Sequence, residues 1–259
     1  MTHAQTVDFG KTAKDYAAYR AGFPDSFFEK LVTPAFTGQS GSVLDLGTGT
    51  GTLARGLALR EFDVTGLDPA PDLLEAAQLL DQKAGTHIKY ITAKAEDTGL
   101  PDESFDIITA GQCWHWFSQD DVLKEARRLL KENGKLIIAY FDWDHDCPPV
   151  MEMRKLRSKY NPDYTGQDWP LGFYPQKPED LTFPGWVPEA SFLYTENVPY
   201  THEGWRGRIR AYAGIGGSLP PETVALFDTE FAAVLKKNCP EEPLQVPHKI
   251  WAGVWSLAQ

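Results

Sequence analysis

The chain has 259 residues, of which 42% are hydrophobic and 12% aromatic, and its formal net charge is −11 at pH 7. This length and apolar fraction suffice for a well-buried core in one α/β domain or in two small ones. The negative charge repels phosphate backbones, so we do not expect a nucleic-acid substrate.

No stretch approaches the roughly 18 consecutive apolar residues that cross a bilayer, and the N-terminus lacks the apolar core of a signal peptide. We therefore expect no membrane partner. The cysteines are Cys113, Cys147 and Cys239, which are odd in number and far apart. They match neither a disulfide framework nor a zinc-binding spacing. These features favour a soluble protein of the reducing cytoplasm.

Between residues 42 and 141, short apolar runs alternate with segments of helical spacing. The predicted strands are Ser42–Leu46, 62–67, 87–91, 104–111 and 135–141. The predicted helices are 52–60, 71–83 and a third that begins with Ser118 as N-cap and ends with Asn133-Gly134 as a left-handed cap. Continuous apolar strands joined by helices are typical of a parallel sheet covered on both faces.

The character of the sequence changes after residue 141. Seven prolines and eight aromatic residues fall between 142 and 186, and we predict an insertion there without a clear core period. Beyond the insertion we expect strands at 191–200 and 248–257 and helices at 205–212 and 222–237.

The stretch VLDLGTGTG, residues 43–51, ends a predicted strand with three glycines on alternate positions. Because glycine is costly in ordered structure, the cluster favours a backbone that approaches a ligand and aims helix N–H groups at it. Asp68 ends the second strand, where an acidic side chain accepts hydrogen bonds from ribose hydroxyls. No G-K-[ST] follows, which excludes a P-loop, and the spacing differs from the G-x-G-x-x-G of dinucleotide sites. A tight turn without a ligand is the alternative.

These residues resemble the class I S-adenosylmethionine-dependent methyltransferases, in the small-molecule branch that includes trans-aconitate methyltransferase-like proteins. VLDLGTGTG resembles the first motif of the family, and GLDPA (66–70) resembles its acidic second-strand end. The stretch 93–117 resembles the adenine and methionine contacts, and YAAYRAGFP (16–24) resembles a substrate-side lid helix. The resemblance covers roughly residues 9–141. It implies a doubly wound, mostly parallel seven-stranded Rossmann-like sheet whose last strand, 248–257, is antiparallel.

The resemblance also implies a set of cofactor-binding residues. They are Tyr16, Arg20, Asp45, Gly47, Thr48, Gly49, Gly51, Asp68, Pro69, Ala70, Glu96, Asp97 and Gln112. The glycine loop would pass along the methionine and ribose moieties of S-adenosylmethionine, and Asp68 would hold the ribose hydroxyls. Asp45 would hold the methionine ammonium or order the loop, because an acid on an apolar strand end needs a reason to be there.

On the adenine side, Pro69 and Ala70 would flank the ring, while Glu96 and Asp97 would read its edge; a simple turn is the alternative for Asp97. Gln112 would approach the methionine end of the cofactor.

In the N-terminal segment, Tyr16, Tyr19 and Arg20 would close over the cofactor. Arg20 is a candidate partner for the cofactor carboxylate, and a solvated helix charge is its alternative. Tyr19 is also a candidate catalytic residue.

Methyl transfer from a sulfonium needs alignment and sometimes a base. His115 is the candidate base, since an imidazole at the carboxyl edge of the sheet can take a proton near pH 7. Its alternative is a packing role between Trp114 and Trp116. We expect no metal; His145 among the carboxylates of DWDHD (142–146) offers a divalent-metal site as the lesser alternative to an acidic turn.

The insertion falls where the family elaborates its substrate pocket. Aromatic residues there are candidate pocket walls or ordinary packing residues: Trp143, Trp169, Phe173 and Tyr174. Several arginines are either candidate ligands of an acceptor carboxylate or exposed helix charges: Arg154, Arg157, Arg206, Arg208 and Arg210.

We predict a single methyltransferase domain over residues 1–259. Its parts are N-terminal lid helices (1–36), a cofactor-binding core (37–141), an aromatic and proline-rich cap (142–188) and C-terminal elements that complete the sheet (189–259). The predicted reaction is methyl transfer from S-adenosylmethionine, with S-adenosylhomocysteine as product, to a small-molecule acceptor at oxygen. The alternatives are a non-catalytic S-adenosylmethionine-binding protein and a nicotinamide-dependent oxidoreductase. The sequence leaves the acceptor and the oligomeric state open.

Overall fold

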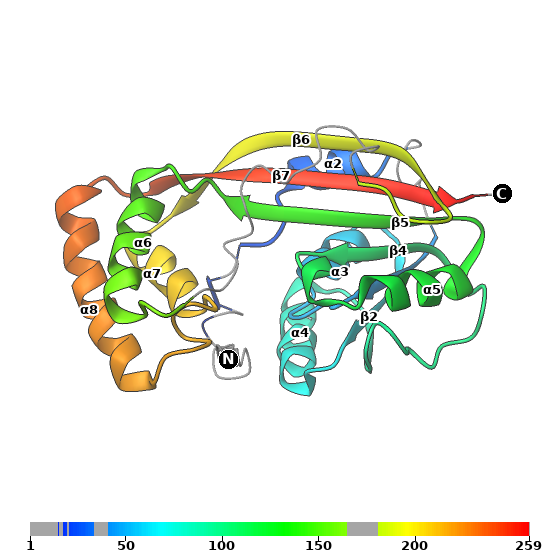
Figure 1. Cartoon of the computed structure of the whole chain (residues 1–259), viewed down its shortest axis with the longest axis horizontal. Coiled ribbons are helices and arrows are strands. Elements are labelled where there is room, and N and C mark those ends of the chain that lie inside the picture. The colour runs from blue at the N-terminus through cyan, green and yellow to red at the C-terminus, as the bar shows by residue number, and fades with distance from the viewer. Residues whose placement is uncertain (1–14, 16–17, 20, 34–40, 165–180, 259) are drawn as a thin grey trace. The chain divides into compact units, whose positions relative to one another are not determined.

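The computed structural model describes residues 15, 18–19, 21–33, 41–164 and 181–258 (Figure 1). In these residues the chain forms a seven-stranded sheet with the order β3-β2-β1-β4-β5-β7-β6. The strands are β1 Ser42–Leu46, β2 Asp63–Asp68, β3 Lys89–Thr92, β4 Phe105–Gly111, β5 Leu130–Trp143, β6 Trp186–Tyr200 and β7 Leu244–Leu257. The helices include α2 Asp25–Leu31, α3 Thr52–Ala58, α4 Pro71–Ala84, α5 Gln119–Leu129, α6 Pro148–Tyr160, α7 His202–Arg210 and α8 Pro221–Asn238.

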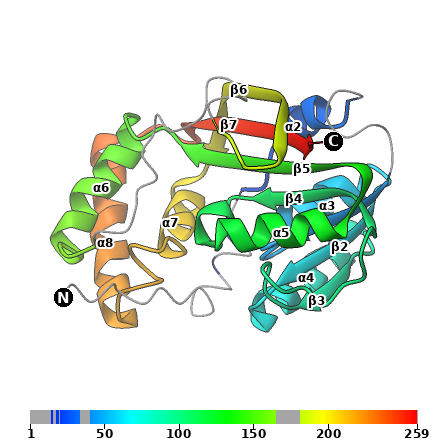
Figure 2. The ribbon, with the colours of Figure 1, turned by 45° about the vertical axis from the view of Figure 1, so that its right-hand side comes forward.

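The predicted parallel sheet is confirmed. Strand β1 pairs in parallel with β2 and β4, β2 with β3, and β4 with β5. Figure 1 shows β7 running opposite to its neighbour β5, as expected for the last strand. Helices α3 and α4 connect strands on one side of β1, and α5 connects β4 to β5 on the other side. Right-handed crossovers therefore place them on opposite faces, and Figure 2 shows α5 in front of the strands.

Two compact units divide the chain. The sheet unit comprises Gly22–Phe141, Tyr174–Tyr194 and Ile250–Gln259, and the helical unit comprises Met1–Ala21, Asp142–Phe173 and Thr195–Lys249. In the helical unit, α6, α7 and α8 enclose a core that contains Trp205, Phe227 and Phe231, each at most 1% exposed.

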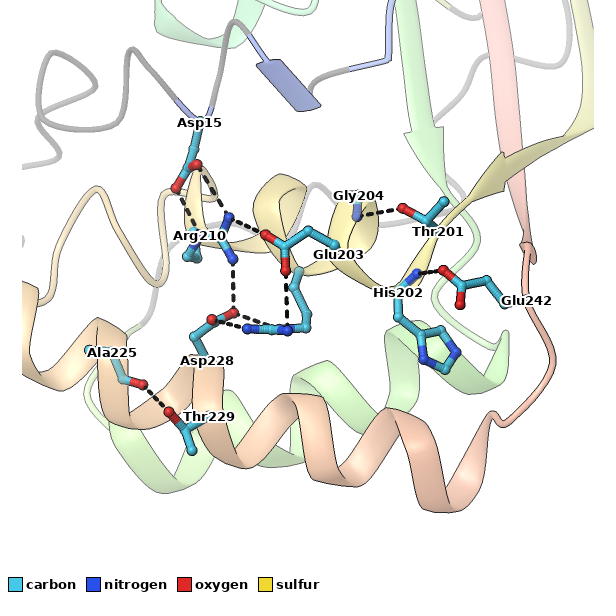
Figure 3. A network of polar contacts seen from close by, with 11 residues as sticks. Asp15, Thr201, His202, Glu203, Gly204, Arg210, Ala225, Asp228, Thr229 and Glu242 are labelled. Atoms are coloured by element: carbon cyan, nitrogen blue, oxygen red, sulfur yellow. Dashed lines mark hydrogen bonds and ion pairs between the residues drawn. The ribbon is translucent and has the colours of Figure 1, made fainter.

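Ion pairs join α7 to α8 in the helical unit (Figure 3). Asp228 of α8 accepts hydrogen bonds from Arg206 and Arg210 of α7, and Arg210 also donates to Glu203, at 2.9 Å. The Arg210 Nε donates to Asp15 at 2.9 Å, so this side chain ties α7 both to α8 and to the N-terminal segment.

The predicted cap of the third helix is wrong. Helix α5 ends at Leu129, and Leu130 already pairs with Phe105 of β4. Asn133 does take a left-handed φ of 63°, but inside β5, where the ladder to β4 shifts register. Leu129 and Leu130 are both buried, so the chain leaves the helix early in order to bury both against the sheet.

The predicted N-cap of α5, Ser118, is confirmed, and its hydroxyl donates to the Asp121 carboxylate at 2.7 Å. One smaller prediction needs correction. The insertion has a core period after all, because α6 buries Val150, Met153 and Leu156 at helical spacing. Helix α6 was not predicted from the sequence because it begins with two prolines, although the first helical turn tolerates proline.

Candidate functional site

The glycine loop, residues 47–51, lies between β1 and α3, where the strand order of the sheet reverses at β1 and β4. In open α/β sheets this switch point is where ligands bind. All three glycines have left-handed φ values, 60° at Gly47, 56° at Gly49 and 75° at Gly51. This backbone conformation is strained for other residues.

The three glycines face different surroundings. A Cβ at Gly47 would lie 2.9 Å from Cβ of Cys113, and one at Gly51 would lie 2.5 Å from the Tyr90 hydroxyl. A Cβ at Gly49 would meet no atom within 4 Å. Protein packing therefore explains Gly47 and Gly51, whereas the open side of the loop lies at Gly49.

Asp45 is buried beneath the loop and is 1% exposed. Its carboxylate accepts hydrogen bonds at 2.7 Å from the hydroxyls of Thr48 in the loop and Thr109 in β4. Burial raises the pKa of Asp45 to about 6, against the opposing effect of these hydrogen bonds, and the negative charge of Asp68 adds to the rise. The hydrogen bond from Thr48 to Asp45 thus ties the glycine loop to the end of β1.

Asp68, at the end of β2, lies against the open part of the loop. One carboxylate oxygen accepts the Gly49 N–H and the other accepts the Ala70 N–H, both at 2.9 Å. Burial raises the pKa of Asp68, and the two backbone hydrogen bonds oppose the rise. The structure therefore brings Gly49, Asp68 and Ala70 together, while Pro69 is exposed.

The loop after β3 carries Glu96 and Asp97. Glu96 accepts the Ser118 backbone N–H at 3.0 Å, and the Asp97 N–H donates to the Lys94 carbonyl at 3.2 Å. The structure thus places Glu96 beside the start of α5 and gives the Asp97 N–H a protein partner.

Glu125 of α5 holds this loop, and sequence reasoning missed it. It accepts both the N–H and the hydroxyl of Thr98, at 3.0 and 2.6 Å. A hydrogen bond from Arg128 lowers the pKa of Glu125 to about 2, so it accepts as a carboxylate. The spacing of three residues between Glu125 and Arg128 on a predicted helix could have indicated this ion pair in the sequence.

The exit of β4 carries Gln112 and His115. Gln112 has a left-handed φ of 60°, and its side-chain amide donates to the Phe141 carbonyl. The half-buried His115 ring lies 4.9 Å from the Trp116 ring and stacks at 6.1 Å on the Tyr140 ring. His115 therefore packs against Trp116 and Tyr140. It follows the carboxyl end of β4, and the glycine loop follows the carboxyl end of the neighbouring parallel strand β1.

Of the N-terminal residues, Tyr16 and Arg20 lie outside the described residues. Tyr19 belongs to the helical unit, where its ring lies against Gly207 of α7 and under the Arg210 guanidinium, 5.6 Å from ring centroid to guanidinium carbon. A Cβ at position 207 would meet this ring at 2.2 Å, so Gly207 permits the contact.

The arginines of α7 divide into two sets. Arg206 and Arg210 form ion pairs within the protein, whereas the Arg208 guanidinium lies 4.6 Å from the Trp143 ring centroid. Trp143 itself packs edge-on against Trp205 and Tyr212 in the core of the helical unit. The other predicted wall residues, Trp169, Phe173 and Tyr174, lie outside the described residues.

No group of three His, Cys, Asp or Glu side chains within the described residues could hold a metal ion. Among the same residues, no helix has the length and apolar character to span a membrane.

Comparison with known proteins gives a consistent picture. Residues 44–138 match the methyltransferase domain family. An uncharacterized methyltransferase of Schizosaccharomyces pombe is 26% identical over 232 residues, which are 88% of each chain. Other curated methyltransferase relatives are matched over 62% or 59% of their own length.

Solved structures share the fold. A protein from Anaeromyxobacter dehalogenans, assigned as a type II methyltransferase, is similar with a TM-score of 0.58 and 21% identity, over 92% of this chain and 97% of that one. Phosphoethanolamine N-methyltransferase 2 of Haemonchus contortus, solved with phosphomonomethylethanolamine and S-adenosylhomocysteine, has a TM-score of 0.50 and 18% identity, over 96% and 57% of the chains. At these identities the likeness concerns the fold.

Proposed function

We propose that this chain, a methyltransferase whose methyltransferase domain spans residues 44–138, binds S-adenosylmethionine in its glycine loop and methylates a small molecule at oxygen. The domain and the fold support the enzyme class. The identity of the cofactor and the kind of acceptor are the proposal.

The observation that carries the choice of cofactor is the pair of buried carboxylates around the loop. Asp45 and Asp68 are 1% and 7% exposed, and burial raises the pKa of both. A cationic ligand relieves this cost, because an opposite charge nearby favours the ionised carboxylate. S-adenosylmethionine carries an ammonium and a sulfonium, whereas the pyrophosphate of a dinucleotide would add negative charge. The Haemonchus neighbour, solved with S-adenosylhomocysteine, also supports the choice.

The residues present fit this cofactor. The backbone at Gly49 is open to a ligand, and Asp68 beside it has a carboxylate that can accept ribose hydroxyls. Glu96 and Asp97 would lie along the adenine, and Gln112 toward the methionine end. When bound, the cofactor supplies a methyl group activated by a sulfonium. The chain holds it in line with the acceptor and excludes water, and such alignment supplies much of the rate.

For the acceptor we favour an oxygen nucleophile on a small molecule, as in the trans-aconitate methyltransferase-like branch that the sequence resembles. Where that oxygen is a hydroxyl, His115 would take its proton, since an imidazole titrates near neutral pH, whereas an acceptor carboxylate is already ionised and needs no base. The buried free cysteines Cys113, Cys147 and Cys239 support a cytoplasmic location.

The test is production of S-adenosylhomocysteine from S-adenosylmethionine with panels of carboxylic acids, phenols, alcohols and amines. Mass spectrometry of the product then gives the methylated atom. Gly49→Ala is the inactive control, because the new methyl group enters the open side of the loop without meeting a protein atom. Its melting temperature is measured as well, because alanine at the left-handed φ of 56° also strains the loop. Turnover with an oxygen acceptor supports the proposal. Turnover with amines alone would refute methylation at oxygen.

A second experiment addresses His115. His115→Asn should lower kcat while the dissociation constant of S-adenosylhomocysteine stays within about twofold, because a base acts on the acceptor and not on the cofactor. An equal loss of cofactor affinity would mean that His115 is a wall of the cofactor site.

A further inference from the structure

The side of the glycine loop that faces the protein is occupied by three polar residues from three elements of the sheet unit. They are Arg55 of α3, Asp81 of α4 and Tyr90 of β3. Two of them lie close to Gly51, where an added Cβ would be 2.5 Å from the Tyr90 hydroxyl and 3.1 Å from Nη2 of Arg55. Gly51 is therefore needed for contact with these side chains.

Arg55 connects the three elements to the loop. Its Nε donates to an Asp81 carboxylate oxygen at 2.7 Å, and its Nη2 donates to the Thr50 carbonyl at 2.9 Å. The same Nη2 donates to the Ala77 carbonyl of α4 at 3.2 Å. The Thr50 carbonyl belongs to the Thr50–Gly51 peptide, so the guanidinium fixes the loop backbone one peptide beyond the open position at Gly49.

Asp81 lies on the buried face of α4, where its carboxylate pairs with Arg55. It lies on the buried stripe of α4 with Leu73, Leu74 and Ala77, and its second carboxylate oxygen accepts the Tyr90 hydroxyl at 2.8 Å. Burial and this hydrogen bond raise the pKa of Tyr90, so the phenol keeps its proton and donates it. Both carboxylate oxygens are thereby used inside the cluster.

Stability alone does not account for a buried ion pair at this place. The side chains of Arg55 and Asp81 are only 14% and 6% exposed. Replacing such a pair by apolar residues is often neutral or stabilising, because desolvation of two charges offsets their attraction. What the pair adds is direction, since a planar guanidinium donates along fixed lines to two acceptors at once.

We propose that Arg55 is a positioning residue for cofactor binding, held by Asp81 and Tyr90, which sets the backbone of the glycine loop through the Thr50 carbonyl. The inference rests on the proposed function, namely that the open side of this loop binds S-adenosylmethionine. Arg55 acts through the loop and does not touch the cofactor.

The test compares Arg55→Lys in α3 with Arg60→Lys, two residues beyond the end of α3. Arg60 also donates to a backbone carbonyl, that of Gly56 at 3.0 Å, and to a carboxylate, that of Asp25 at 2.9 Å, but it does not reach the loop. Lysine keeps the charge at either position. At position 55, however, a single ammonium on a flexible stem does not reproduce the fork that serves Asp81 and Thr50 together.

Titration calorimetry with S-adenosylhomocysteine and thermal unfolding without ligand are measured on the full chain. We expect Arg55→Lys to raise the dissociation constant about tenfold, which is about 1.4 kcal/mol, and Arg60→Lys to leave it within twofold. Both ligand-free variants should stay fully folded at the temperature of the titration, although the partner of Arg55 is 6% exposed and that of Arg60 is 90% exposed. Tyr90→Phe, which removes one hydroxyl from Asp81, should raise the dissociation constant less than Arg55→Lys does.

The outcomes separate the two claims. If the unchanged protein does not bind S-adenosylhomocysteine, the proposed function fails. If the unchanged protein binds it and Arg55→Lys binds equally well, the positioning role fails while the cofactor site stands. A loss of affinity that only follows a loss of melting temperature, or one shared by Arg60→Lys, also overturns the positioning role.

Discussion

Asp45 makes the stability of this protein depend on pH in a way that one substitution can isolate. Its pKa is raised from 3.8 to about 6 by burial. The protonated form therefore prefers the folded state, and its contribution to the free energy of unfolding is present in full below pH 4 and is lost as the pH rises through 6. Each pKa unit is worth about 1.4 kcal/mol, so the whole loss is about 3 kcal/mol. About 2 kcal/mol of this falls between pH 4.5 and 7.5.

Asp45→Asn removes the ionisation and keeps the shape of the side chain. The amide can still accept from Thr48 or Thr109 through its oxygen and donate through its nitrogen, whereas the wild-type carboxylate accepts from both hydroxyls. We expect the stability of the variant relative to the wild type to increase by about 2 kcal/mol from pH 4.5 to 7.5.

Urea unfolding followed by circular dichroism at pH 4.5, 5.5, 6.5 and 7.5 measures this difference. Carboxylates that do not interact with Asp45 titrate equally in both proteins, so the difference reports the ionisation of Asp45 together with its coupling to Asp68. A difference that stays constant within about 0.5 kcal/mol would refute the reasoning, because Asp45 would then ionise in the folded protein as easily as in the unfolded chain.

Three further predictions concern the loop and the helical unit. Asp68→Ala should weaken S-adenosylhomocysteine binding by about 1.5–3 kcal/mol, the range for hydrogen bonds to a charged group; calorimetry giving unchanged affinity would rule out a ribose-binding Asp68. Gly47→Ala should lower the free energy of unfolding by about 1–3 kcal/mol, because its Cβ would crowd Cys113, and a urea midpoint equal to that of the wild type would contradict the packing. Asp228→Ala should cost about 2 kcal/mol, since it removes an acceptor that is 16% exposed from two arginines. Glu203→Ala, at a side chain 52% exposed, should cost under about 0.5 kcal/mol. Equal unfolding curves for the two variants would show that this ion-pair network does not stabilise the fold.

The strands of the parallel part were predictable because β1, β4 and β5 contain continuous apolar runs and helical segments separate the strands. The seven-stranded sheet with an antiparallel last strand was implied by the resemblance to the methyltransferase family and not by these runs. The errors arose where two local signals compete. Asn133-Gly134 has the composition of a helix cap, but burial of Leu129 and Leu130 against β4 decides where α5 ends. The prolines before Val150 suggested a loop, yet they occupy the first turn of α6.

The site divides in a similar way. The glycine loop and Asp68 are visible in the sequence because an unusual backbone requires glycine and an acid at a strand end is unusual. The partners that hold the loop come from distant positions, such as Thr109, which lies 64 residues from Asp45. Asp81 is an acidic residue within the apolar stripe of α4, and this position could have indicated the cluster of Arg55, Asp81 and Tyr90.

A thermal-shift comparison of S-adenosylhomocysteine, S-adenosylmethionine and NAD on the purified full chain tests the central claim most directly. A ligand at about 100 times its dissociation constant adds roughly 2.7 kcal/mol to the free energy of unfolding. In a chain of this length that is a rise of about 5–10 °C. We predict this rise with the two adenosyl compounds and none with NAD. A rise with NAD alone would contradict the account and make a nicotinamide-dependent oxidoreductase the better description of the site.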